Sequence, residues 1–144
     1  MAEQSFQNHA RWVPPFHFFV LPVLFINLGF SLYWCGKSGF SVSSVLGVLV
    51  SAAILLGFML ARMMAMTVQD RVIRMEERLR FERILPSDLQ ARIGEFTTDQ
   101  FVSLRFASDA ELPELARRIL EEKIYNRKAI KQMIKTWRPD FARA

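Results

Sequence analysis

Two long stretches without a charged side chain constrain this sequence more than any other feature. Residues 12–36 and 38–61 form runs of 25 and 24 positions without Lys, Arg, Asp or Glu, and only Lys37 stands between them. A helix needs roughly 20 apolar residues to cross the hydrocarbon core of a bilayer. The sequence therefore predicts two transmembrane helices, at residues 13–36 and 39–62.

The segment between the two predicted spans is too short to hold a domain. We expect residues 37–38 to form a short external turn, so that the second helix returns antiparallel to the first. Pro22 lies inside the first span, where it removes one backbone hydrogen bond and favours a kink. The two spans are thus expected to form a helical hairpin in the bilayer.

The distribution of cations predicts which way this hairpin faces. Of the 19 Lys and Arg residues, 17 lie after residue 61. Cytoplasmic flanks of membrane helices are enriched in these residues, so the C-terminal part is expected in the cytoplasm. With two spans, the N-terminal segment of residues 1–12 is expected there too, which makes the chain a multi-pass protein with both termini cytoplasmic.

Small residues recur every four positions along the second span and form two stripes. In lipid, small side chains let helix backbones approach closely and gain van der Waals contact. One stripe can pack within the hairpin, and the other is free to contact a second copy or another membrane protein. The first stripe is Ser43, Gly47 and Ser51, and the second is Ala53, Gly57, Ala61 and Ala65.

The second helix is expected to continue beyond the bilayer, because no stop signal occurs between Arg62 and Pro86. Residues 63–85 would then form a cytoplasmic helical stalk. Four of its apolar residues recur at spacings of four, three and four, which is typical of a helix packed against one partner helix. Apolar positions near the C-terminus could also cover this seam. The seam consists of Val68, Val72, Met75 and Leu79.

Start signals for several helices follow in residues 86–144. A short helix is expected at residues 86–94, and residues 97–100 and 108–111 both resemble capping boxes. The second box is expected to open a helix that runs to Trp137. The expected fold class is all-α: a transmembrane helical hairpin with the second helix extended into the cytoplasm, and a C-terminal segment of two or three helices.

Basic side chains crowd the last expected helix. A solvated helix face explains them most simply, and anionic lipid headgroups near the membrane are the alternative, because basic residues there bind them. Nucleic acid is disfavoured, since no binding motif accompanies the charge. The residues that would bind headgroups are Lys123, Arg127, Lys128, Lys131 and Lys135.

Few residues suggest chemistry. His17 lies within the first span and is a weak candidate for binding a tetrapyrrole, although most such residues are structural. The single cysteine, Cys35, excludes an intramolecular disulfide and a cysteine-rich zinc site. The sequence has no phosphate loop, nucleophile elbow or His-Glu metal helix, so we expect neither catalysis nor a cofactor or metal. If the hairpin forms, one polar cluster gathers at its cytoplasmic end: His9, Arg11, His17, Arg62, Gln69 and Asp70.

Three segments of the sequence are familiar from other proteins. Residues 7–11 with Pro14 and Phe16-His17-Phe18, residues 67–74, and residues 104–109 with Glu111-Leu112-Pro113 resemble a family of short bacterial membrane proteins. That family is catalogued only as a domain of unknown function. The resemblance covers nearly the whole chain. It implies two spans and a bacterial cytoplasmic (inner) membrane, and it implies no activity and no functional residue.

These observations favour a non-enzymatic interaction protein. The expected function is that of a small accessory or assembly subunit, whose hairpin packs in a larger membrane complex or in a homo-oligomer. One alternative is a membrane-surface organiser that binds anionic lipid through the basic C-terminal helix. The other is a tetrapyrrole-binding protein or small membrane enzyme centred on His17.

Overall fold

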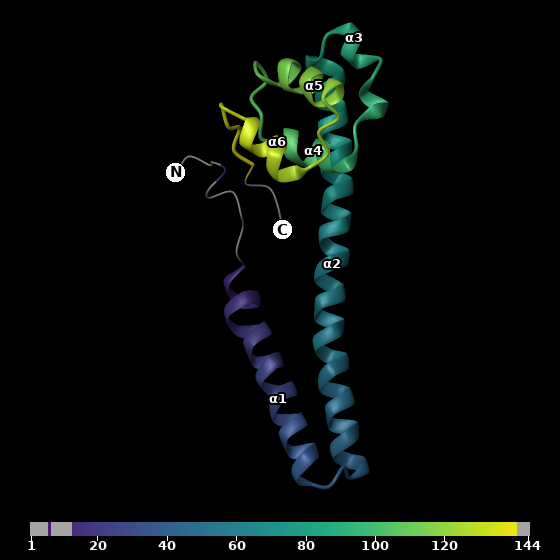
Figure 1. Ribbon diagram of the computed structural model, residues 1–144, viewed down its shortest axis with the longest axis vertical. Helices are drawn as coiled ribbons and strands as arrows, with labels where there is room; N and C mark the ends of the chain where they lie inside the picture. Colours follow the sequence, from purple (N-terminus) through teal and green to yellow (C-terminus); the bar gives the residue numbers. More distant parts are fainter. Residues whose placement is uncertain (1–5, 7–12, 141–144) are drawn as a thin grey trace. The chain divides into compact units, whose positions relative to one another are not determined.

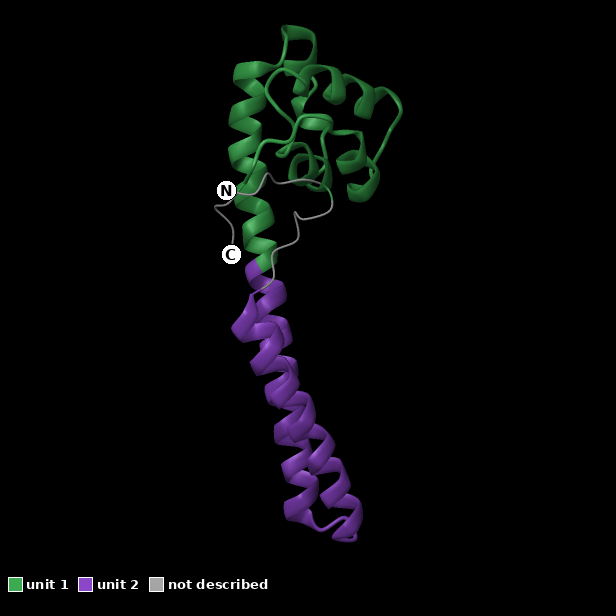
Figure 2. Ribbon diagram, turned by 90° about the vertical axis from the view of Figure 1, so that its left-hand side faces the viewer, with its two compact units in different colours: residues 1–10, 66–144 green, residues 11–65 purple. Residues whose placement is uncertain are grey.

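The computed structural model describes Phe6 and residues 13–140. It divides into two compact units, which are coloured separately in Figure 2. The hairpin unit is Arg11–Ala65, and the C-terminal unit comprises Met66–Ala144 together with Met1–Ala10. All named elements in the described part of the chain are helices, so the expected all-α class is confirmed.

The hairpin unit begins with an irregular turn. A π-helical segment, η1 (Pro15–Val20), leads directly into α1 (Leu21–Lys37), which is labelled in Figure 1. The Leu21 N–H donates to the carbonyl of Phe16, five residues earlier. Such a widened turn is a common accompaniment of a proline within a helix. Pro22 directly follows this segment, and because it has no backbone N–H it cannot donate to the turn before it.

A four-residue turn joins α1 to α2 (Val42–Ile84), so the connection is longer than the expected residues 37–38. Gly39 and Phe40 both have positive φ angles, of 64° and 58°. Glycine adopts this left-handed conformation at little cost, and it reverses the chain here. The Ser41 hydroxyl accepts a hydrogen bond from the Ser44 N–H at 3.4 Å, which caps the first turn of α2.

Polar contacts join α1 to α2 in the middle of the hairpin. The Asn27 side-chain amide donates to the Ser51 hydroxyl at 3.0 Å, and the Ser31 hydroxyl lies 3.0 Å from the same oxygen. The Ser51 hydroxyl in turn donates to the Gly47 carbonyl at 2.9 Å. Nearer the turn, the Ser38 hydroxyl donates to the Ser44 hydroxyl at 2.8 Å. The paired residues are thus six positions apart at the turn and 24 apart at Asn27 and Ser51, so the two helices run antiparallel as expected.

Four short α-helices and one 3₁₀ turn build the C-terminal unit against the second part of α2. This is more than the two or three helices expected. Proline at position 86 ends α2, because its ring and missing N–H do not suit a helix interior. The elements that follow are α3 (Ser87–Gln90), η2 (Ile93–Glu95), α4 (Thr98–Leu104), α5 (Leu112–Glu121) and α6 (Arg127–Met133).

An aromatic cluster forms the centre of the core in this unit. Phe81 of α2 lies with its ring centroid 5.3 Å from that of Phe96 and 5.0 Å from that of Phe101. Both distances suit favourable aromatic pairs. Around these rings pack apolar side chains from every helix of the unit. They include Leu85, Leu89, Ile93, Leu104, Phe106, Leu112, Ile119, Ile130 and Ile134.

The two expected capping boxes differ in the structure. Thr97 and Gln100 form a complete box at the start of α4, with the Thr97 N–H donating to Gln100 Oε1 at 2.8 Å. In the second, the Glu111 N–H donates to the Ser108 hydroxyl at 3.4 Å. The Glu111 carboxylate instead accepts the backbone N–H groups of Lys135 and Thr136, at 2.9 and 3.0 Å.

The prediction of a single long helix from residue 108 to Trp137 is wrong, because α5 ends at Glu121 and α6 begins at Arg127. Lys123 between them has a φ of 51°, which ends a helix. The buried Gln100 side chain donates to the Ile124 carbonyl at 2.9 Å and fixes the loop. The Asn126 side chain then accepts two backbone N–H groups at the start of α6.

Candidate functional site

Within the C-terminal unit, α2 presents two faces of opposite character. On one face Ile73, Phe81 and Leu85 are buried against the helices of the unit. The seam residues occupy the other face, and their exposed fractions are 59% for Val68, 48% for Val72, 68% for Met75 and 60% for Leu79. Figure 2 shows α3 to α6 gathered on one side of α2. The seam is therefore an apolar surface that the unit's own core leaves open.

The C-terminal apolar positions do not cover the seam, which corrects one expectation from the sequence. Ile119, Ile130 and Ile134 pack in the cluster that contains Phe81 and Leu85. In an α-helix successive residues turn by about 100°, so Phe81 and Leu79 point to different sides. The core thus uses a different face of α2 from the one with heptad spacing.

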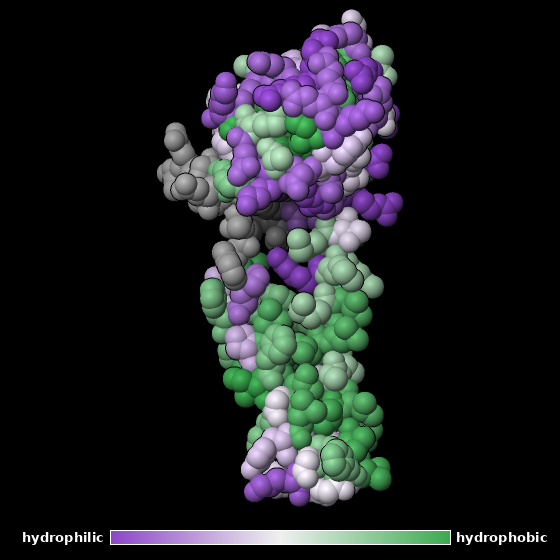
Figure 3. All heavy atoms as spheres, in the orientation of Figure 1, coloured by the Kyte–Doolittle hydropathy of each residue, from purple (hydrophilic) through white to green (hydrophobic). Residues whose placement is uncertain are grey.

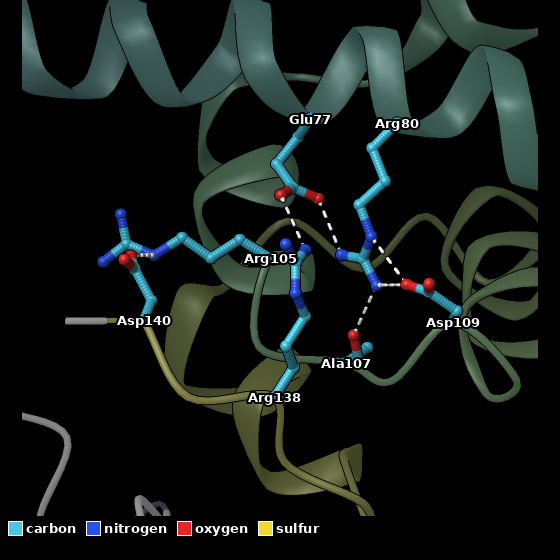
Figure 4. A network of polar contacts seen from close by, with 7 residues as sticks. All are labelled: Glu77, Arg80, Arg105, Ala107, Asp109, Arg138 and Asp140. Atoms are coloured by element: carbon cyan, nitrogen blue, oxygen red, sulfur yellow. Dashed lines mark hydrogen bonds and ion pairs between the residues drawn. The ribbon is translucent and has the colours of Figure 1, made fainter. Parts of the chain in front are cut away.

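An ion network lies beside this core, on the buried face of α2 (Figure 4). Glu77 and Arg80 are only 7% and 4% exposed. The Arg80 guanidinium donates to Glu77 Oε2 at 2.9 Å, to Asp109 Oδ1 at 2.6 and 2.9 Å, and to the Ala107 carbonyl at 2.7 Å. A buried guanidinium is tolerated only when its donors are paired in this way. Arg80 therefore fastens α2 to the loop before α5.

The same network reaches the C-terminal segment through two more arginines. Arg138 Nη1 lies 3.7 Å from Glu77 Oε1, and Arg105 Nε lies 3.2 Å from Asp140 Oδ2. The Arg105 guanidinium also lies 4.6 Å from the centroid of the Phe106 ring. Burial raises the pKa of Glu77, and the attraction of Arg80 opposes this without cancelling it.

A small polar pocket of about 90 Å³ opens beside the network. Its walls carry three carboxylates and two guanidinium groups, and each guanidinium group already pairs with one of the carboxylates. The lining residues include no hydroxyl, thiol or imidazole that could act as a nucleophile or a neutral base. We therefore assign the network a structural role. The pocket is lined by Ile73, Glu76, Glu77, Arg105, Arg138, Pro139 and Asp140.

The polar cluster expected at the end of the hairpin is divided between the two units. His9 and Arg11 lie outside the described residues. In the hairpin unit, the Arg62 guanidinium lies 5.5 Å from the centroid of the Phe16 ring, which in turn meets His17 edge-on. In the C-terminal unit, Gln69 is half-buried, and Asp70 Oδ2 accepts from Arg127 at 2.8 Å.

The His17 ring contacts the backbone of its own helical turn. Its Nδ1 lies 3.0 Å from the Val13 carbonyl and 3.2 Å from the Val13 N–H. One ring nitrogen is thus engaged by the backbone. In the described part of the chain, no three His, Cys, Asp or Glu side chains gather in a group that could hold a metal ion.

The five basic residues expected on the last long helix are dispersed over α6 and the segments beside it. Lys123 precedes α6 and Lys135 follows it, so only the middle three lie on that helix. Arg127 bridges Asp70 and Asp99, and the hydrogen bond to Asp99 is the main cause that raises the pKa of Arg127. Lys131 lies 5.3 Å from the centroid of the Phe106 ring. Lys123, Lys128 and Lys135 remain exposed.

The two stripes of small residues have different surroundings. In the first stripe, Ser51 is buried between α1 and α2, whereas Ser43 and Gly47 are exposed beside it. The four members of the second stripe are all exposed. They are Ala53, Gly57, Ala61 and Ala65, and two of them line a shallow apolar groove with Ile54 and Phe58.

Sequence reasoning missed the ion network around Arg80. The only local signal is that Arg80 stands between the apolar residues Leu79 and Phe81. Its partners Ala107 and Asp109 are 27 and 29 residues away, so spacing could not identify them.

Comparison with known proteins gives a family without an assigned activity. No curated protein and no solved structure matches this chain. The model of one protein family, described as "Family of unknown function (DUF6526)", matches residues 1–144. The chain therefore belongs to this family of unknown function.

Proposed function

We propose that this chain is a non-enzymatic integral membrane protein of the bacterial inner membrane, which acts as an accessory or assembly subunit. In this proposal the hairpin spans the bilayer, the C-terminal unit lies in the cytoplasm, and the seam on α2 binds a partner helix. The observation that carries the proposal is the exposure of Val68, Val72, Met75 and Leu79 on a unit that has its own complete core.

Helix length and surface character support insertion of the hairpin in a membrane. Two helices, at Pro15–Lys37 and Val42–Ile84, are long and apolar enough to span a bilayer. Figure 3 shows that apolar residues cover most of the visible surface of the hairpin unit, whereas polar residues dominate that of the C-terminal unit. Phe18, Ile26 and Val42 are 69%, 71% and 86% exposed, which favours a lipid environment for these side chains.

The length of α2 supports a cytoplasmic extension. Its 43 residues correspond to about 65 Å at 1.5 Å per residue, which is roughly twice the 30 Å hydrocarbon thickness. The second half of the helix must therefore leave the bilayer. That half carries five of the chain's 14 arginines, and this enrichment favours the cytoplasmic side.

The seam supports the binding of another protein. Burying a Val, Leu or Met side chain stabilises by about 1.5–3 kcal/mol relative to full exposure. Four half-exposed side chains in one line thus offer several kcal/mol to a partner that covers them. A partner helix fits best, because the spacing of four, three and four presents them as knobs along a single line.

The two alternatives have less support in the structure. Five residues were proposed to bind anionic lipid. Of these, Arg127 is paired with two carboxylates and Lys131 is half-buried, so three exposed lysines remain. For a tetrapyrrole, His17 has one ring nitrogen engaged by the Val13 backbone. Binding of nucleic acid has no supporting motif.

Purification of the tagged full-length chain from its native membrane tests the proposal. We expect the chain to elute in mild detergent as a stoichiometric complex, identified by mass spectrometry. Met75→Gln should weaken that complex, whereas Arg74→Gln, on the neighbouring exposed position off the seam, should not. A monomer without any associated protein, in both detergent and native membrane fragments, would contradict the proposal.

A further inference from the structure

We infer that the partner of the seam is a second copy of this chain, with the two α2 helices parallel and in register over Val68 to Leu79. This inference rests on the proposed membrane function. Copies of one membrane protein insert with the same orientation, so their α2 helices run in the same direction. The inference names the occupant of the seam, which the proposed function leaves open.

The spacing of the seam is self-complementary. In heptad notation, Val72 and Leu79 occupy a positions, and Val68 and Met75 occupy d positions. In a parallel pair each a or d side chain packs beside its own copy, so one seam supplies both halves of the interface. A β-branched valine at an a position is favourable for a two-stranded pair.

Charges beside the seam match this arrangement. Arg71 stands at a g position and Glu76 at the following e position. Parallel in-register packing brings a g residue next to the e residue five positions later on the other helix. Arg71 of one copy therefore meets Glu76 of the other, and symmetry repeats the pair. Both side chains are exposed in the single chain, which leaves them accessible for this contact.

The charge pattern also determines where the contact between the two helices ends. Glu82 occupies the next d position after Met75, where a buried carboxylate is unfavourable. Arg78 and Arg83 would be the next g and e pair, and they carry the same sign. Arg78 already pairs with Glu82 of its own helix at 3.4 Å. The parallel contact thus ends at Leu79.

Space is available for the second copy on the C-terminal unit. The helices α3 to α6 pack on the other face of α2, where Ile73, Phe81 and Leu85 are buried. The contact spans 12 residues, or about 18 Å of helix, which is short for an independent coiled coil. Membrane confinement raises the effective concentration of two anchored helices and favours a short seam. We therefore expect the pair to form in membranes more readily than in dilute detergent.

Cysteine cross-linking in membranes tests the inference with the full-length chain. In a Cys35→Ser background, single cysteines are introduced by Val72→Cys, Met75→Cys and, as the control, Arg74→Cys. Disulfides require Cα atoms within about 7 Å, which parallel a and d positions satisfy and a c position does not. We expect a mild oxidant to give several times more disulfide dimer for the two seam variants than for Arg74→Cys.

The outcome separates this inference from the proposed function. Cross-linked species of twice the chain mass, verified by mass spectrometry, support the second copy. A cross-link from Val72→Cys or Met75→Cys to a different protein overturns the second copy and leaves the proposed partner binding intact. Equal yields for all three cysteines, or no dimer from any of them, overturn the inference.

A charge exchange tests the register. In the Val72→Cys background, Arg71→Glu and Glu76→Arg are each expected to lower the dimer yield severalfold, because they place like charges opposite each other. The double variant Arg71→Glu/Glu76→Arg should restore the yield, since it exchanges the signs of the same pair. Single variants without effect, or a double variant that fails to recover while remaining folded, contradict the parallel register.

Discussion

The hairpin unit and the C-terminal unit place their apolar side chains in opposite ways. Among the described residues 13–65, the buried positions are Cys35 and Ser51, and most large aromatic and aliphatic side chains are exposed. The C-terminal unit instead surrounds Phe81 and Phe101 with a closed apolar core. Under the proposed function, lipid supplies the apolar surroundings of the first unit, whereas the second folds by excluding water from its own interior.

The largest effect is expected for a matched pair of phenylalanine truncations. Phe81 is 0% exposed and Phe25 is 58% exposed. Phe81→Ala should destabilise the C-terminal unit by about 4 kcal/mol, because it leaves a cavity in the core. Phe25→Ala should change stability far less, since lipid can fill the space. Denaturant unfolding of the full chain in detergent measures both, and similar losses would break the comparison between the units.

Removal of Arg80 is expected to have the next largest effect. Arg80→Ala leaves Glu77 buried without its main cation and strands the Ala107 carbonyl, so we expect a loss of about 3 kcal/mol. The matched control is Arg78→Ala, whose exposed ion pair with Glu82 contributes about 0.5 kcal/mol or less. The same unfolding measurement applies. Equal values for the two variants would show that the ion network does not hold α2.

A smaller effect concerns the pH dependence set by Glu77. Burial raises the folded-state pKa of Glu77 above its usual 4.5. The stability that Glu77 contributes is therefore greatest below pH 4.5, and it falls as the pH rises through the raised value. Glu77→Gln cannot titrate at this position. The difference in unfolding free energy, wild type minus Glu77→Gln, should thus decrease with rising pH and then become constant. An opposite slope would show that Arg80 dominates the pKa.

The smallest effect is expected for the polar contact inside the hairpin. Ser51→Ala removes the hydrogen bonds that link Ser51 to Asn27 and Ser31. Contacts of this kind between membrane helices contribute about 1 kcal/mol. Ser43→Ala, at the exposed member of the same stripe, is the control and should have no measurable effect. Steric trapping or thermal unfolding in bilayers can compare them, and a loss well above 2 kcal/mol would show that the hairpin depends on this one hydroxyl.

Local patterns in the sequence were sufficient to predict the hairpin, the long second helix and its end at Pro86. Hydrophobic length, helix propensity and proline geometry depend on neighbouring residues alone, so a single sequence is enough to predict their effects. The capping box at Thr97 is equally local and is confirmed. These features define the hairpin unit and the seam on α2.

The features that the sequence did not predict depend on contacts between residues far apart in the chain. The loop at Ile124 is fixed by Gln100, 24 residues earlier, and the last expected helix is interrupted there. Arg127 was grouped with the lysines as a headgroup ligand, yet Asp70 lies 57 residues from it in sequence and binds it. No spacing rule identifies such partners, because they are brought together only when α2, α4 and α6 pack in the same unit.

Thiol labelling of spheroplasts is the most direct test of the central claim, that a lipid-embedded hairpin carries a water-folded cytoplasmic unit. In a Cys35→Ser background, Lys37→Cys places a thiol at the end of α1 and Gln132→Cys places one on the exposed surface of α6. A membrane-impermeant maleimide should label Lys37→Cys in intact spheroplasts and Gln132→Cys only after lysis. Labelling of Gln132→Cys in intact spheroplasts, or failure to label Lys37→Cys there, would contradict the proposed membrane topology.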